Sequence, residues 1–398
     1  MLFVPLLMLV STFLLAFYNF YYKRRKLPPG PMPLPLVGNI LTLIRKRPGE
    51  DAFLEWKRKY GPIYTYWLGE MPVVCVADYE SIVQVFSKGG DEFTQRNIYG
   101  IFFINGDFWK EQRKFASTVF RNFGLYSNIM EKKILAELSL MFDRIDRKLA
   151  KSESNEINLI EDSSNYGDFV EAFLKEKERL DATGIGHSFS LDQLWNVCMD
   201  LWIAGQETSS TIIAWGFAHL LHNPQSLARL YDELERVIGN DRRLITIADK
   251  QSLPYTNATI NEFLRISNMV VQNAYRRVFV DVNIGNFRIP KGTCILPQIS
   301  VVLADDDVFA DPKIFRPERF LDEKGNFVKC EKLIPFSVGR RKCFAESMAK
   351  MEIFLFTANI VNQYRISASK VLPSIKREMG ITIHCPKFEC RVEKRINE

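Results

Sequence analysis

The chain begins with an uninterrupted apolar run. Residues 1–22 contain no charged side chain and are mostly Leu, Phe, Val and Met, and four consecutive cations follow them. About 20 apolar residues are enough for a helix to span a bilayer. Because the cations follow the apolar run, and a basic start and a small-residue cleavage site are absent, the pattern predicts an uncleaved single-pass signal anchor over 1–22. A buried core helix is the alternative.

Residues 23–35 combine the basic cluster with a proline-rich stretch, Leu-Pro-Pro-Gly-Pro-Met-Pro-Leu-Pro. Proline fixes φ and lacks an amide donor, so this stretch favours stiff, extended chain. We interpret 23–35 as a hinge between the anchor and the remaining residues, 36–398.

Beyond the hinge, the apolar positions mostly follow a helical period. Their spacing predicts helices over 51–60, 108–120, 129–148, 166–179, 190–222, 224–238, 255–265 and 344–362. A β-hairpin is expected over 62–76, a second β-rich stretch over 276–296, and an extended tail over 376–392. Helices dominate and the strands fall in separated patches, which predicts a mainly α fold with small β-sheets.

Composition narrows the class of protein. The 398 residues are 47% hydrophobic, which is enough for one large core or two modest ones. Net charge is +6, but no basic block with interleaved aromatic residues occurs in the body of the chain, so no nucleic-acid partner is expected. The seven cysteines are odd in number and lack CxxC spacing, which indicates a reducing compartment.

The sharpest candidate site is the segment Phe336-Ser-Val-Gly339-Arg-Arg341-Lys-Cys343. It precedes the helix expected from 344, so the Cys343 thiol is expected at the positive end of a helix and beside three cations. Both features favour a thiolate. An incidental cysteine next to a basic loop is the alternative.

Three further patterns occur upstream of Cys343. Trp109 and Arg113 lie one turn apart on an expected helix, and Glu262 and Arg265 are spaced to share one helical face. The third pattern is the Glu-Thr pair at 207–208, which follows Ala-Gly-Gln within the long helix expected over 190–222. Taken singly, each is compatible with an ordinary polar helix surface.

Together and in this order, the four patterns resemble the cytochrome P450 family, and their details are closest to its microsomal, drug-metabolising animal members. The resemblance implies a P450-like fold and heme b (iron protoporphyrin IX), with Cys343 as the axial ligand of the iron. The other residues that it assigns to the haem site are Phe336 and Gly339 in the cysteine loop and Trp109, Arg113, Arg276 and Arg341 at the propionates.

The resemblance also assigns Thr208 and Glu207 to oxygen activation and proton relay. It implies that Glu262 and Arg265 join Arg319 in a buried structural network. The implied activity is insertion of one atom of O2 into a lipophilic organic substrate: a xenobiotic, a fatty acid or a sterol. NADPH would supply electrons through a flavoprotein reductase, with cytochrome b5 as a further candidate partner. The membrane is expected to be the endoplasmic reticulum, with the catalytic domain, 36–398, in the cytosol in contact with membrane lipid.

Two departures qualify the resemblance. The chain is expected to be shortened near 91–100 and 149–166, where family members carry a substrate-contact loop and the helices that roof the substrate cavity. An incomplete roof would admit water to a site that depends on a dry pocket. The alternative reading is therefore a truncated, catalytically inactive haem-binding membrane protein, from a splice variant or an incomplete gene model. A third, milder departure is Ala345, where the family usually has Gly.

Overall fold

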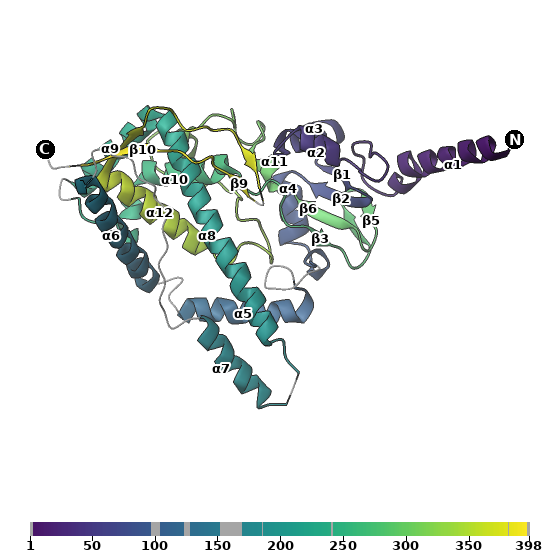
Figure 1. Ribbon diagram of the computed structural model, residues 1–398, viewed down its shortest axis with the longest axis horizontal. Helices are drawn as coiled ribbons and strands as arrows, with labels where there is room; N and C mark the ends of the chain where they lie inside the picture. The colour runs from purple at the N-terminus through teal and green to yellow at the C-terminus, as the bar shows by residue number, and fades with distance from the viewer. Residues whose placement is uncertain are drawn as a thin grey trace. The chain divides into compact units, whose positions relative to one another are not determined.

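The computed structural model describes residues 3–96, 104–122, 128–151, 169–184, 186–239, 242–380 and 382–395. The fold is mainly α-helical with small sheets, as predicted (Figure 1). The chain forms two compact units, which we call the sheet unit (Met1–Ile98, Val270–Ala310 and Ile334–Lys342) and the helical unit (Tyr99–Met269, Asp311–Leu333 and Cys343–Glu398). The expected division into anchor, hinge and one catalytic domain stays a prediction.

The sheet unit is built on a four-stranded sheet. Its order is β1 (Ile63–Leu68), β2 (Met71–Val76), β6 (Cys294–Pro297) and β3 (Arg276–Arg277). Strands β1 and β2 form the predicted antiparallel hairpin, which turns at Gly69, where φ is +59° and glycine is favoured. β2 pairs with β6 in parallel, and β6 pairs with β3 in the antiparallel direction.

Helices and a second hairpin complete the sheet unit. The helices are α1 (Phe3–Phe20), α2 (Ile40–Arg45), α3 (Glu50–Tyr60), α4 (Tyr79–Ile82) and α11 (Ile299–Leu303), and the hairpin is β4 (Val282–Ile284) with β5 (Phe287–Ile289). Aromatic residues join α3 to the sheet, because Phe53 and Trp56 contact Tyr66 with ring centroids 5.5 and 5.6 Å away.

The first helix bears on the predicted anchor. α1 is largely exposed, and the segment Leu6–Arg24 is long and apolar enough to cross a membrane. Just beyond it, Lys23 forms an ion pair with Glu70 at 2.8 Å and lies 4.6 Å from the centre of the Trp67 ring. At least one cation of the basic cluster therefore contacts the β1–β2 hairpin.

The helical unit carries the longer helices. They are α5 (Gly106–Asn122), α6 (Asn128–Lys151), α7 (Phe169–Asp181), α8 (Leu191–His222), α9 (Pro224–Ile238), α10 (Pro254–Ser267) and α12 (Glu346–Gln363). The Ser190 hydroxyl caps α8 by accepting from the Gln193 amide at 3.1 Å, and proline occupies the first position of α9 and of α10. Two small sheets pair β7 (Tyr364–Ala368) with β10 (Cys390–Lys394) and β8 (Glu378–Met379) with β9 (Ile383–His384).

The predicted boundaries were wrong in two places near the end of the chain. The helix expected from 344 begins at Glu346, so Cys343 lies in the loop before α12. Strand β7 was not predicted, because the chain passes from α12 into it without a turn residue. Most of the two segments expected to be shortened, 91–100 and 149–166, lies outside the described residues, so the expected shortening stays a prediction.

Candidate functional site

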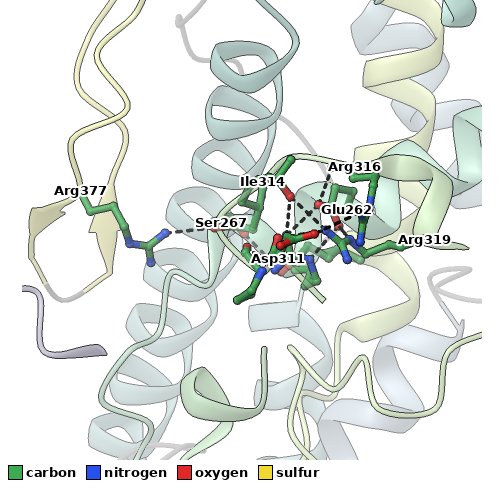
Figure 2. A network of polar contacts seen from close by, with 11 residues as sticks. Glu262, Ser267, Asp311, Ile314, Arg316, Arg319 and Arg377 are labelled. Atoms are coloured by element: carbon green, nitrogen blue, oxygen red, sulfur yellow. Dashed lines mark hydrogen bonds and ion pairs between the residues drawn. The ribbon is translucent and has the colours of Figure 1, made fainter. Parts of the chain in front are cut away.

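Glu262, Arg265 and Arg319 meet in the helical unit (Figure 2). The Glu262 carboxylate accepts from Arg265 Nε at 2.8 Å and Nη2 at 2.7 Å, and Arg319 Nε lies 3.1 Å from it. The spacing of three along α10 places the first two on one face. All three side chains are at most 7% exposed. Burial lowers the pKa of Arg319, and Glu262 opposes that effect.

The same network ties α10 to the segment before Arg319. Arg265 Nη1 donates to the Pro312 carbonyl at 2.8 Å, and the Arg316 amide donates to Glu262 at 2.9 Å (Figure 2). Each buried charge therefore has a partner of opposite sign and further hydrogen bonds. Removing one member of such a set leaves a buried charge uncompensated, so the arrangement suits a structural role.

The cysteine loop packs tightly within the sheet unit. Gly339 has φ +73°, and a Cβ at this position would overlap the carbonyl oxygen of Phe86, so only glycine fits. Arg341 Nε donates to the Thr94 carbonyl at 2.8 Å, while Phe336 is half-buried. The glycine and the arginine thus fix the loop against 86–94.

Arg276 is a buried cation in the sheet unit. It is 1% exposed, its Nη1 lies 3.4 Å from the Phe93 carbonyl, and its guanidinium lies 4.4 Å from the centre of the Phe86 ring. Its Nε has no hydrogen-bond partner, and no carboxylate among the described residues forms an ion pair with it. Burial, and then the nearby charges of Arg96 and Arg341, hold the pKa of Arg276 well below its usual value.

Three cations in this cluster lie close enough to oppose one another's charge. Such an arrangement fits an anionic ligand, because guanidinium groups bind carboxylates strongly in buried sites. The propionates of a haem are groups of this kind, so the residues present fit the implied cofactor. Sequence reasoning did not identify Arg96 as a site residue. Its one local indication is that it follows Gln95, which forms an isolated β-bridge with Arg277 of β3.

In the helical unit, α5 contacts the residue that follows Cys343. Trp109 is buried, and the Arg113 guanidinium lies 5.6 Å from the centre of the Trp109 ring and 5.9 Å from that of Phe344. The Phe120 ring is 5.5 Å from Phe344. Cys343 itself is half-buried and is not part of a disulfide. The pair on α5 and Phe344 thus belong to one local cluster of the helical unit. A single cysteine is the ligand set of a thiolate-bound haem.

The Glu207–Thr208 pair lies midway along α8. The Thr208 hydroxyl donates to the Ala204 carbonyl at 2.7 Å, and a Cβ added to Gly205 would meet no atom within 4 Å. The Glu207 carboxylate reaches the C-terminal hairpin, where Thr382 and His384 contact it. Sequence reasoning did not identify these two residues.

The predicted site residues are therefore divided between the units. The structure brings together Arg276 and Arg341 in the sheet unit and Trp109, Arg113 and Phe344 in the helical unit, where Glu262, Arg265 and Arg319 form a separate network.

Comparison with known proteins assigns the family. A family model described as Cytochrome P450 matches residues 28–166 and 152–392. The chain belongs to the cytochrome P450 family, and with its homologues this indicates a haem-dependent monooxygenase that uses O2.

Mammalian relatives resemble nearly the whole chain. It is 30% identical to cytochrome P450 2C7 of Rattus norvegicus over 91% of its own length and 92% of the relative's, and 30% identical to cytochrome P450 2C4 of Oryctolagus cuniculus over 89% and 91%. Cytochrome P450 2C8 of Homo sapiens is 28% identical over 92% and 93%. That alignment spans 460 positions although the chain has 398 residues, so it contains positions that this chain lacks.

Proposed function

We propose that this chain is a membrane-anchored haem-thiolate monooxygenase that acts on a lipophilic organic molecule and receives NADPH-derived electrons from a flavoprotein reductase. The observation that carries the proposal is the buried Arg276 guanidinium, which lies near two other arginines and has no carboxylate partner among the described residues. A buried cation in this position is stabilised when an anionic ligand binds.

The site residues are proposed to hold the haem. Cys343 would be the axial ligand, and the groups that would bind the propionates are Trp109, Arg113, Arg276 and Arg341, with Arg96 added. Phe336 and Gly339 would shape the cysteine loop. When bound, the haem supplies the activation of O2, which the donation of electron density from the thiolate favours.

The Glu207–Thr208 pair on α8 would take part in proton transfer. Glu207 can hold or release a proton at its carboxylate. The single hydroxyl hydrogen of Thr208 already points to the Ala204 carbonyl, so its oxygen is available as an acceptor until the hydroxyl rotates. The open space at Gly205 would leave room for small molecules beside this pair.

The proposed location is the membrane of the endoplasmic reticulum, with α1 as the anchor and the rest of the chain in the cytosol in contact with lipid. The length and apolar character of α1 support an anchor. Cytochrome b5 is proposed as a second electron donor, and the substrate class stays at xenobiotics, fatty acids or sterols. Protease treatment of intact microsomes would test the topology, and digestion of the bulk of the chain from outside is expected.

One observation favours a second candidate, a haem-binding protein without turnover. The N-terminal half of α8 exposes Leu191, Trp195 and Trp202, at 63%, 67% and 63% of their surfaces. Their spacing places them on one side of the helix. Large apolar side chains on one exposed face indicate surface that another segment would cover in a closed cavity.

The deciding experiment is the carbon-monoxide difference spectrum of the reduced, purified full chain. Wild type is expected to show the signature of thiolate-bound haem, and Cys343→Ser to lose it. Cys330→Ser is the matched control, because Cys330 is also half-buried, and it is expected to keep the signature. A folded chain that purifies without porphyrin, or a Cys343→Ser protein with the wild-type spectrum, would overturn the proposal. Oxygen-dependent product formation with reductase and NADPH then separates the working enzyme from the second candidate.

A further inference from the structure

The β8–β9 hairpin is fixed to the helical unit at several points. The Ile383 amide donates to the Met269 carbonyl at 2.8 Å, and the Ile383 carbonyl accepts from Trp215 Nε1 of α8 at 3.0 Å. The Ile383 side chain is buried. Arg377, the residue before β8, donates to the carbonyls of Ile266 and Asn268 at the end of α10, at 3.0 and 2.9 Å. These donors satisfy carbonyls that a helix end leaves without intrahelical partners.

The two residues that flank Ile383 both reach one oxygen of Glu207. Thr382 directly precedes β9 and His384 ends it, and both side chains contact α8. Thr382 Oγ1 donates to Glu207 Oε1 at 3.0 Å, and His384 Nδ1 lies 3.1 Å from the same atom. The His384 contact is a hydrogen bond when Nδ1 carries a proton.

The β8–β9 hairpin orients the Glu207 carboxylate, although Glu207 itself lies on α8. Thr208 and Ser210 direct their hydroxyls to backbone carbonyls of α8, at Ala204 and Gln206. Glu207 Oε2 has no partner among the described residues, because both contacts of this carboxylate are made by Oε1. One oxygen is thus held and the other is left to exchange a proton.

We propose that Thr382 and His384 are positioning residues that clamp Glu207 Oε1 and thereby direct Oε2 for proton transfer. The clamp itself needs no cofactor, whereas its effect on turnover rests on the proposed monooxygenase function. Motion of the hairpin would then alter the orientation of the acid on α8, so residues near the C-terminus would influence proton delivery without contacting the haem or the substrate.

The test combines hydrogen–deuterium exchange with turnover in two backgrounds. The double variant Thr382→Val/His384→Leu removes both donors. Loss of about 1 kcal/mol of hydrogen bonding is expected to speed amide exchange in the hairpin about fivefold. Thr382→Ser, which keeps a hydroxyl, is expected to keep exchange slow. Glu378→Gln is the matched control, because Glu378 pairs with His384 in the β8–β9 register and has no contact with Glu207.

Turnover then shows whether the clamp acts through Glu207. In the wild-type background, the double variant is expected to lower kcat about tenfold with little change in KM and to release more peroxide per NADPH consumed, since a displaced acid delivers protons poorly. Glu207→Gln still accepts hydrogen bonds but cannot relay a proton. In that background the double variant is expected to speed exchange again without a further loss of kcat.

Each result bears on a different claim. Unchanged hairpin exchange in the double variant would overturn the clamp. Faster exchange with an equal loss of kcat in the Glu207→Gln background would overturn the positioning role, because the hairpin would then act by another route. A wild-type chain with no thiolate spectrum would overturn the proposed function and the relay with it, whereas the exchange result would still decide whether the clamp exists.

Discussion

Two regions bury charged side chains, and they do so in opposite ways. In the helical unit, Glu262 lies between Arg265 and Arg319, so its negative charge is matched by neighbouring cations. In the sheet unit, Arg276 is as deeply buried but lies near two further cations and no described carboxylate. The first arrangement is complete within the protein. The second is not, and our proposal is that a ligand with negative charge completes it. If so, burial alone does not distinguish a structural charge from a binding charge, whereas the sign of its neighbours does.

The largest effect is expected from Glu262→Ala. The change leaves two buried guanidinium groups without their carboxylate, which costs about 3–5 kcal/mol of the free energy of unfolding. Urea unfolding of the haem-free chain measures it. Glu393→Ala is the control, because Glu393 is exposed on β10, and a change within about 0.5 kcal/mol is expected there. A loss below 1 kcal/mol at Glu262 would contradict the structural role.

Acid is expected to destabilise the fold through His219, which burial keeps uncharged. Burial, and then the charges of His222, Arg377 and Arg265, lower the pKa of His219 from 6.5 to about 4. Below pH 6.5 the unfolded chain therefore binds a proton that the folded chain excludes, and the free energy of unfolding falls until about pH 4. Between pH 7 and pH 5 this group is expected to remove about 2 kcal/mol.

His219→Phe tests that expectation. The ring keeps its packing against Phe315, whose centroid is 5.6 Å away, but it cannot take up a proton. Urea unfolding at pH 7 and pH 5 should show a smaller difference for the variant than for the wild type. An equal difference for both proteins would show that His219 does not contribute.

Arg276→Met is expected to stabilise the haem-free chain, whereas most core substitutions lower the free energy of unfolding. Without haem, removal of an unmatched buried cation should raise the free energy of unfolding by about 1–3 kcal/mol. With haem, loss of a charged partner should speed haem release about tenfold to a hundredfold. Transfer of haem to apomyoglobin measures the release. Arg277→Met on the exposed neighbour is the control, with neither effect expected. If the haem-free variant is less stable than the wild type, Arg276 is a structural charge, as Arg265 is, and not a binding charge.

The smallest effect is expected from Arg340→Gln. Arg340 pairs with Asp91, but both side chains are about half exposed, so solvent and salt screen the pair. A loss below about 1 kcal/mol is expected, and it should vanish in concentrated salt. A larger or salt-independent loss in urea unfolding would show that the Arg340–Asp91 pair holds the cysteine loop to 91–94 more strongly than its exposure to solvent indicates.

Local patterns predicted the elements well and the contacts between distant residues poorly. The period of apolar residues located α8 and the β1–β2 hairpin, because each depends on neighbours along the chain. Arg96 and the contact of His384 with Glu207 were not predicted, since each depends on segments that fold together from far apart in the sequence. The glycine at 339 was noticed only as part of a motif, and its steric reason, the carbonyl of Phe86, is a long-range contact.

The exposed row of Leu191, Trp195 and Trp202 on α8 has a practical consequence for handling the protein. Removal of α1 is the obvious route to a chain that needs no detergent, but it would leave this second exposed apolar surface in place. We expect the shortened chain to self-associate in plain buffer and to become monodisperse only when the two tryptophans are replaced by polar residues.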